Sequence, residues 1–429
     1  MSDRKFGIET LALHAGQIPD AATGSRAVPL YQTTSFVFDS AEHAASLFNL
    51  ATFGNVYTRL SNPTTAVFEE RMAALENGRA CVATASGQAA EATAILTLCE
   101  AGDHIVSAST LYGGTYTLFE VNLRRLGIET TFVDPSDPEN FRRAITPKTK
   151  IVYAETLGNP QLNIIDLEKV AAIAHEAGIP FMVDNTVPSP YLCRPFEWGA
   201  DIVVHSATKY LGGHGTSMGG AIVESGKFNW ADPKTAGKFP GMHEPSRGYH
   251  GVRFYETFGD FGYTMRARME VLRTFGPAIS PFNSWMLLQG METLPLRMDR
   301  HCENAMKVAL FLKDHPRVAW VNYPGLPGDS QHDLAKKYLP KGASGLLNFG
   351  VKGGVEAGVK FIEGATFMSH LANIGDAKTL IIHPASTTHR QLSEEEQKRA
   401  GVLPDMVRMS VGLESVEDIL WDIDQALGA

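Results

Sequence analysis

The sequence is poor in cysteine and contains no long apolar run. Its 429 residues include only four cysteines, and no two of them form a CxxC pair. A zinc site or a disulfide framework is therefore not expected, and reduced thiols in a cytosolic enzyme are the simpler interpretation. The amino terminus has no apolar signal segment, and no window holds the ~18 continuous apolar residues of a membrane span. We therefore expect a cytoplasmic protein that does not associate with membranes.

Clustered positive charge is absent as well. The formal net charge is -9, and no run of lysine and arginine is long enough to follow a phosphate backbone, which argues against nucleic-acid binding. We find no repeats and no low-complexity tract. The 44% hydrophobic composition is ample for a core, and the length suggests two or three domains.

The residue pattern divides the chain into three regions. Residues 1–60 scatter Gly, Pro, Ser and Thr among aromatics and are interpreted as an irregular, extended N-terminal arm. Residues 61–280 form a predicted first domain, with an excursion at about 225–280 that is too rich in aromatics to be a flexible linker. Residues 281–429 form a predicted smaller α+β C-terminal domain.

Apolar runs and helical patterns alternate within the first domain. Asn62 opens a helix that Gly78 ends, Ser86 opens the next, and a further helix runs from Asp166 to Gly178. Between the helices lie predicted strands, several of them continuous apolar runs typical of strands buried on both faces: "DHIVSAST", "KTKIVYAET", "IPFMVDN", "ADIVVHS" and "GAIVES". This alternation predicts an α/β fold with a mainly parallel sheet wrapped by helices.

The C-terminal region has a different order of elements. A long helical pattern runs through "MDRHCENAMKVALFLKDH", strands are predicted at "GLLNFGV", "TLIIHP" and "MVRMSVG", and Ser415 opens a final helix.

Polar side chains fall at the ends of three predicted strands of the first domain. Asn159 comes after "IVYAETLG", Asp184 after "IPFMV", and Lys209 after "ADIVVH". Ligands bind beyond the carboxyl ends of strands in such sheets. Taken alone, Asp184 can cap a turn and Lys209 can be an exposed turn residue. Together, a carboxylate that keeps a pyridine nitrogen protonated and an amine that reacts with an aldehyde suit pyridoxal phosphate (PLP).

The phosphate of PLP needs an anion site, and "TASGQAAEATAIL" can supply one. Gly87 and Gln88 stand at the first turn of a predicted helix, where free N–H groups and the positive dipole end favour a dianion. Ser206 and Thr208 can add hydroxyl donors beside the lysine. A Ser-Gly pair before an Ala-rich helix is by itself only an N-cap.

The glycines after the lysine permit close approach of the backbone to a ligand. Gly212, Gly213 and Gly215 lie in "YLGGHGTSMGG". The spacing is GxGxxxG rather than GxGxxG, and no strand directly precedes it. A nucleotide-binding α/β protein without covalent chemistry is therefore a remote alternative.

Two further residues suit an amino-acid substrate on PLP. Tyr112, in "TLYGGTY", follows another strand end and can stack on the pyridine ring. Arg408 is a charge between the apolar residues of "MVRMSVG" and suits an α-carboxylate. An ordinary loop tyrosine and a surface salt bridge are the alternatives.

Together these residues resemble a known family, the PLP enzymes of cysteine and methionine metabolism. The motifs occur in the family's order over essentially the whole chain: "YTRLSNPT", "ASGQAA", "LYGGTY", "VDNT", "HSATKYLGGHG", "HPASTTHR" and "VRMSVGLE". The resemblance implies the large fold-type I PLP domain and a small C-terminal domain. It also implies a homo-oligomer, usually a tetramer built from two tight dimers.

The resemblance implies roles for the residues around the cofactor. Lys209 resembles the lysine that binds PLP and moves the substrate proton, and Asp184 resembles the partner of the ring nitrogen. Tyr112 resembles the stacking tyrosine, which assists the lysine. The phosphate cradle is matched by Gly87, Gln88, Ser206 and Thr208.

Other matched residues concern the substrate and the neighbouring subunit. Tyr57 and Arg59 match the pair that reaches the phosphate of the adjoining subunit. Asn159 and Arg408 match groups beside the cofactor and at the substrate carboxylate. Asn373, in "ANIGDAKTL", takes the place of a serine that the family often carries before Leu-Gly.

Two features narrow the resemblance. Gly113 and Gly114 follow Tyr112, whereas methionine γ-lyases carry a cysteine shortly after that tyrosine. The long excursion is similar to that of the O-acetylhomoserine sulfhydrylases, which implies formation of L-homocysteine and acetate from O-acetyl-L-homoserine and sulfide. Cystathionine γ-synthase, O-succinylhomoserine sulfhydrylase and methionine or cystathionine γ-lyase are the alternatives.

The excursion also leads to an expectation about specificity. Because Phe228–Tyr263 follows the cofactor lysine closely in sequence, we expect it to wall the substrate entrance. Its cations Arg247, Arg253 and Lys238 are then the candidates for meeting a succinyl carboxylate, and we predict a preference for acetyl.

Overall fold

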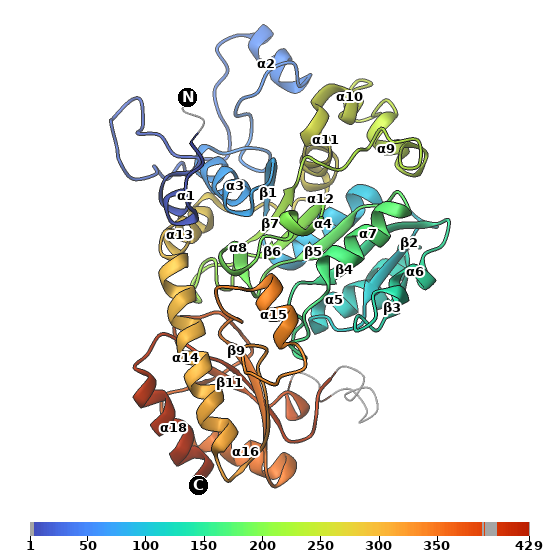
Figure 1. Ribbon diagram of the computed structural model, residues 1–429. Coiled ribbons are helices and arrows are strands. Elements are labelled where there is room, and N and C mark those ends of the chain that lie inside the picture. Colours follow the sequence, from blue (N-terminus) through green and yellow to red (C-terminus); the bar gives the residue numbers. More distant parts are fainter. Residues whose placement is uncertain (1–3, 388–389, 391–400, 429) are drawn as a thin grey trace.

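Two sheets organise the computed structural model, which describes residues 4–387, 390 and 401–428 (Figure 1). Two residues of the "HPASTTHR" motif, Thr388 and His389, lie outside the described residues. Helix α14 (Leu294–Asp314) runs from the larger sheet's unit along the smaller one (Figure 1).

The larger sheet is mainly parallel, as predicted. It has seven strands in the order β1-β7-β6-β5-β4-β2-β3. Among them β7 is antiparallel to both of its neighbours, while β6, β5, β4, β2 and β3 pair in parallel. The strands are β1 (Ala80–Thr84), β2 (His104–Ala108), β3 (Glu129–Val133), β4 (Thr149–Glu155), β5 (Phe181–Asp184), β6 (Ile202–Ser206) and β7 (Gly220–Glu224).

Strands β1 and β3 were not predicted from the sequence. β1 reads "ACVAT" and lies between two strongly helical patterns, so it gives no separate signal. β3 reads "ETTFV" and is one of the two edge strands, with no residue along its length fully buried. β3 lacks the continuous apolar run that marks the central strands, and the run in β1 covers only residues 80–83.

Helices cover the larger sheet, and three of them, α3, α4 and α7, begin at the predicted caps Asn62, Ser86 and Asp166. Asn62 accepts the backbone N–H of Thr64, and Ser86 accepts that of Ala89 at 3.1 Å. The helices are α3 (Pro63–Glu76), α4 (Gly87–Leu98), α5 (Gly113–Thr117) with a following π-helical segment (Leu118–Leu123), α6 (Glu139–Ala144), α7 (Leu167–Glu176), α8 (Ser189–Leu192) and α13 (Pro281–Glu292).

The end of α3 differs from the prediction. Asn77, not Gly78, adopts the left-handed conformation that closes the helix, with φ 59°. Gly78 is required for another reason, because a Cβ there would lie 2.5 Å from a methyl of Val223 on β7. The glycine therefore serves close packing rather than the cap.

The smaller sheet has five strands in the order β10-β11-β12-β9-β8. The three predicted strands are present as β9, β11 and β12, whereas β8 and β10 were not predicted. The elements are β8 (Val318–Asn322), β9 (Leu346–Val351), β10 (Ser369–His370), β11 (Leu380–Ile382), β12 (Met406–Ser410), α15 (His332–Tyr338), α16 (Gly354–Gly364) and α18 (Val416–Gly428).

The two hydrophobic cores meet within α14. Met298 and Cys302 belong to the core of the larger sheet, whereas Ala305 and Val308 belong to that of the smaller one. The long predicted helix is thus shared by both units. The division of the chain at residue 281 stays a prediction.

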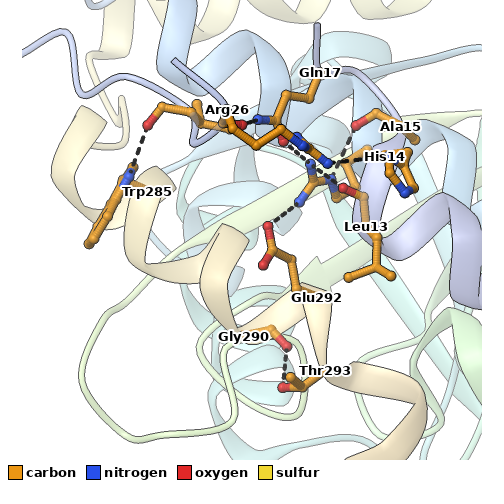
Figure 2. Close-up of polar contacts among 11 residues, drawn as sticks. Leu13, His14, Ala15, Gln17, Arg26, Trp285, Gly290, Glu292 and Thr293 are labelled. Atoms are coloured by element: carbon orange, nitrogen blue, oxygen red, sulfur yellow. Dashed lines mark hydrogen bonds and ion pairs between the residues drawn. The ribbon is translucent and has the colours of Figure 1, made fainter. Parts of the chain in front are cut away.

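The N-terminal arm is less irregular than predicted, since it contains α1 (Ile8–His14) and α2 (Ala41–Phe48). Its first part is anchored by Arg71 of α3, which is fully buried. Arg71 donates to the carbonyl of Ala15 at 3.1 Å and to Gln17 Oε1 at 3.2 Å, and pairs with Glu292 at 3.5 Å. Figure 2 shows these partners gathered between the arm and α13.

The excursion is ordered, as predicted. It lies at the edge of the larger sheet opposite to the carboxyl ends of the parallel strands, where a ligand site is expected. Thr235 donates to the carbonyl of Gly178, which precedes β5, and Asp260 pairs with Arg79, which precedes β1. Phe228–Tyr263 therefore packs at the amino-terminal edge of the parallel strands, and the expectation that it walls the entrance is wrong within one chain. Its helices are α9 (Pro240–His243), α10 (Phe254–Phe258), α11 (Gly262–Arg266) and α12 (Arg273–Phe275), with a π-helical segment (Ala267–Leu272) before α12.

All four cysteines are buried with free thiols. Within the described ranges, no helix has both the length and the apolar character needed to cross a bilayer.

Candidate active site

The carboxyl ends of β4, β5 and β6 lie side by side. Glu155, the last residue of β4, is opposite Asp184, the last of β5, and Asp184 is opposite Val204 of β6. Parallel pairing therefore brings Asp184 and the residues that follow β6, including Lys209, to one edge of the sheet.

Lys209 is half-buried at this edge, and its amine is close to the smaller domain. Its Nζ donates to Oδ1 of Asn373 at 2.5 Å. Burial, together with the positive charge of Arg408, lowers the pKa of Lys209 from 10.5 to about 8. An amine with this pKa is partly neutral near pH 8, which suits both a nucleophile and a base.

Arg408 reaches the same place from β12. It donates through Nη1 to Oδ1 of Asn159 at 3.1 Å and through Nη2 to the carbonyl of Asn373 at 3.3 Å. Burial lowers the pKa of Arg408 to about 10, and the guanidinium remains charged at neutral pH. Lys209, Asn373, Arg408 and Asn159 were all singled out from the sequence, and the structure brings their side chains together between the two sheets.

Gly213 and Gly215 were predicted to let the backbone approach a ligand, but the structure packs other side chains of the protein against them. A Cβ on Gly213 would lie 2.0 Å from Nη1 of Arg297, and one on Gly215 would lie 2.4 Å from Asp376. Both glycines have positive φ. Arg297 of α14 donates to the carbonyl of Tyr210 at 2.7 Å, so it fixes the loop that carries the lysine. We missed Arg297 because it lies within an ordinary helical pattern.

The start of α4 lies against Ser206, an arrangement that the predicted phosphate cradle requires. A Cβ on Gly87 would lie 2.6 Å from that of Ser206, so only glycine permits this approach. The first N–H groups of a helix have no intrahelical acceptor and point toward an anion placed there.

Two other cradle candidates have their side chains engaged elsewhere. The hydroxyl of Thr208 donates to the carbonyl of Gly219 at 3.2 Å and accepts its N–H at 3.1 Å. The side-chain amide of Gln88 donates to Glu91 at 2.8 Å. Gln88 can therefore bind a phosphate only through its backbone N–H. The hydroxyl of Thr208 can donate to a phosphate only if it gives up its hydrogen bond to the carbonyl of Gly219.

Three carboxyl groups, those of Glu91, Glu155 and Asp184, form a cluster where β5 ends. Glu91 and Glu155 are buried, and Asp184 is partly exposed toward the site. Burial raises the pKa of Asp184, and it raises that of Glu155 far above its usual range with help from the negative charge of Asp184. Across the described ranges none of the three forms an ion pair. A protonated pyridine nitrogen would supply the missing cation, so these residues fit PLP.

Glu155 also positions two predicted site residues. Its carboxylate accepts the backbone N–H of Tyr112 at 2.6 Å and that of Asn159 at 3.1 Å. Sequence reasoning missed Glu155 as well as Glu91. The available signal for Glu155 was a carboxylate at the end of an otherwise apolar strand.

Tyr112 and the arm residues are exposed in the single chain. Tyr112 is 52% exposed beside the site, and Tyr57 is 42% exposed. The guanidinium of Arg59 lies 5.4 Å from the centre of the Tyr57 ring. Throughout the described residues, no hydrogen bond, ion pair or ring contact joins Tyr57 or Arg59 to the strand-end residues of their own chain.

Known proteins share this arrangement. A model of the Cys/Met metabolism PLP-dependent enzymes matches residues 9–428. The chain is 57% identical to the O-acetyl-L-homoserine sulfhydrylase of Leptospira meyeri over 99% of this chain and 97% of that protein. It is 54% identical to the homocysteine synthase of Schizosaccharomyces pombe over 98% of this chain and 97% of that protein.

A solved structure has nearly the same fold as this chain. It is a provisionally named O-acetylhomoserine (thiol)-lyase of Campylobacter jejuni that carries N'-pyridoxyl-lysine-5'-monophosphate. It matches with a TM-score of 0.96 and 41% identity over 99% of this chain and 100% of that one. The chain belongs to the PLP-dependent enzymes of cysteine and methionine metabolism, and its cofactor is PLP. The predicted family and cofactor are confirmed, and the nucleotide-binding alternative is set aside.

The lowered pKa of Lys209 leads to a prediction for the cofactor-free protein. Burial disfavours the charged amine, so between pH 8 and 10.5 Lys209 is mainly neutral, whereas an ordinary lysine is protonated. Its rate of reaction with an amine-selective reagent should reach half its plateau near pH 8. Peptide mapping after pulses of reagent at a series of pH values measures this. Arg408→Gln should move the midpoint upward, and a rate that still climbs like that of a free lysine peptide would contradict the assignment.

Proposed function

We propose that this enzyme catalyses a γ-replacement, in which O-acetyl-L-homoserine and sulfide give L-homocysteine and acetate. The observation that carries the proposal is the meeting of Lys209, Arg408, Asn159 and Asn373 at the strand ends. It combines a base of lowered pKa with a guanidinium suited to an amino-acid carboxylate. Relatives that are similar over nearly the whole chain bear the names of this activity.

The residues divide the work of the reaction. PLP, when bound, withdraws electrons from the substrate carbon attached to nitrogen. Lys209 holds the cofactor and then moves the α-proton, and Asp184 holds the ring nitrogen protonated. Arg408 binds the α-carboxylate beside Asn159. The C–O bond at Cγ breaks as acetate leaves, and sulfide forms the new C–S bond there.

The fold favours the acetyl donor. A site built for succinyl would offer a cation to its terminal carboxylate. The candidates Arg247, Arg253 and Lys238 lie in the excursion, whose anchoring contacts are at the opposite edge of the sheet. In the part of the chain that the structure describes, no hydrogen bond or ion pair joins them to Lys209, Arg408, Asn159 or Asn373. The smaller, uncharged acetyl group needs no such partner.

Steady-state kinetics test the donor and the acceptor together. With purified enzyme, kcat/KM should be higher for O-acetyl-L-homoserine than for O-succinyl-L-homoserine, because the succinyl carboxylate has to lose water without gaining a cation. Homocysteine should form faster with sulfide than cystathionine forms with cysteine. A better succinyl donor, or α-ketobutyrate released from methionine at a comparable rate, would contradict the assignment and favour one of the related activities.

We further propose that the active site is shared between subunits of a homo-oligomer, a tetramer built from two dimers. Tyr57 and Arg59 lie between α2 and α3, in the arm whose helix α2 extends away from the larger sheet (Figure 1), and within the described residues no hydrogen bond, ion pair or ring contact joins them to their own chain's site. A symmetric dimer can exchange such arms reciprocally. The four buried thiols suit a reducing cytoplasm, which we propose as the location.

Complementation between two inactive variants tests the shared site. Arg59→Ala and Lys209→Ala are unfolded, mixed in equal amounts and refolded. In randomly formed dimers one site of each mixed dimer carries both changes and the other carries neither, so about a quarter of all sites should be active. Each variant refolded alone is the control. A mixture as inactive as both parents would show that the arm serves its own subunit.

A further inference from the structure

Glu76, the last residue of α3, carries a fully buried carboxyl group that the proposed reaction does not use. Its Oε1 accepts two hydrogen bonds, one from the side-chain amide of Asn185 at 2.8 Å and one from Nε2 of His205 at 2.6 Å. Both partners are fully buried as well. Asn185 directly follows β5, and His205 belongs to β6. A single oxygen of α3 therefore joins two neighbouring strands of the larger sheet.

This junction lies on the face of the sheet opposite to the candidate site. The backbone N–H of Asn185 donates to the carbonyl of Val204 at 3.0 Å, so Asn185 continues the parallel ladder in which Asp184 is opposite Val204. Side chains alternate between the two faces of a sheet. Asp184 and Ser206 therefore lie on one face. Asn185 and His205, which are their neighbours in the chain, lie on the other face, where the end of α3 meets them.

Asn185 is held from three directions. Besides its hydrogen bond to Glu76, its amide donates to the carbonyl of Cys193 at 2.9 Å, and its side-chain oxygen accepts the hydroxyl of Thr156 at 2.9 Å. Thr156 in turn donates its backbone N–H to the carbonyl of Asp184 at 2.9 Å. A buried amide with this many partners has one orientation. The backbone around it, including that of Asp184, is therefore fixed in place.

Stability alone is a weak explanation for this junction. Burying the carboxyl group of Glu76 and the imidazole of His205 costs about as much free energy as their 2.6 Å contact returns. A pair of apolar residues of similar size is generally as stable in such a place. Hydrogen bonds are directional, however, and apolar contacts are not. The polar contact is therefore suited to define a geometry.

We propose that Glu76 is a positioning residue for the cofactor, because it fixes the separation between Asp184 and Ser206. The inference rests on the proposed roles of these two residues, Asp184 at the ring nitrogen of PLP and Ser206 at its phosphate. The ring of PLP is rigid, so both of its ends can be bound at once only when the two strand ends keep one spacing. Glu76 sets that spacing from the opposite face of the sheet.

Calorimetric titration of the cofactor-free protein with pyridoxine 5'-phosphate tests the proposal. This compound has the ring nitrogen and the phosphate of PLP but no aldehyde, so it reports on both ends without reacting with Lys209. Glu76→Gln keeps an oxygen that can accept both hydrogen bonds, and the dissociation constant should stay within about threefold of wild type. In a double variant, Glu76→Leu with His205→Leu, it should rise roughly tenfold or more, since the strand ends lose their common acceptor.

Two controls separate positioning from a general loss of structure. Inorganic phosphate reports on the phosphate cradle alone, and its affinity should change by less than about twofold in the double variant. His104→Leu removes another buried imidazole, on β2, which contacts Thr149 at 2.8 Å and Thr131 at 2.9 Å. This variant should lower the unfolding temperature and leave the affinity for pyridoxine 5'-phosphate unchanged.

Asn185→Ala covers the case in which the double variant does not fold. It detaches β5 alone, leaves the contact between Glu76 and His205 intact, and should weaken the binding of pyridoxine 5'-phosphate in the same direction. Wild-type affinity in the double variant, or in Asn185→Ala if the double variant does not fold, would overturn the proposal. An equal loss of affinity for inorganic phosphate, or a loss in Glu76→Gln as large as in the double variant, would also overturn it.

Asp184→Ala and Ser206→Ala distinguish this failure from failure of the proposed function. If either of them weakens the binding of pyridoxine 5'-phosphate while the Glu76 variants bind it normally, the inference about Glu76 alone is wrong. If both bind it like wild type, the assignment of the two cofactor ends is itself wrong, and the inference about Glu76 falls with it.

Discussion

The burial of several carboxyl groups at the ends of β4 and β5 is the constraint on which the rest of the site depends. Parallel register sets Glu155 beside Asp184, and α4 adds Glu91 from above the sheet. Burial of carboxyl groups without a cation is costly. The protein lessens this cost with hydrogen-bond donors from Tyr112, Asn159 and Thr186. A protonated ring nitrogen of the cofactor would meet the remaining demand for a positive charge, as we propose for Asp184.

The positive groups of the site come from different elements, which explains its position between two sheets. Lys209 belongs to the loop after β6, and Arg297 of α14 fixes that loop. Arg408 belongs to β12 of the smaller sheet and contacts Asn159 of the larger unit. Burial, together with the positive charge of Arg408, lowers the pKa of the Lys209 amine, whereas burial alone lowers that of the guanidinium, which stays charged. Closure of the two units against each other thus tunes the base.

Much of the fold was predictable because the central strands have an unambiguous pattern. "IPFMV" and "ADIVVH" are continuous apolar runs, and the residues that follow such a run lie at the ligand edge, which is how Asp184 and Lys209 were singled out. Edge and short strands such as β3 lack that pattern. Long-range packing was also invisible: the sequence cannot tell that Gly213 makes room for Arg297, or that the excursion folds back to the far edge of the sheet. Glu91 was missed because a glutamate in an Ala-rich helix is normally exposed.

The covalent position of the cofactor is the most direct test of the central claim that the residues at these strand ends hold PLP. The native enzyme is reduced with borohydride, digested, and its peptides are mapped by mass spectrometry. The pyridoxyl mass should appear on the peptide that contains Lys209, and Lys209→Ala should carry no label. A label on any other lysine of the wild-type enzyme would contradict the assignment of this site.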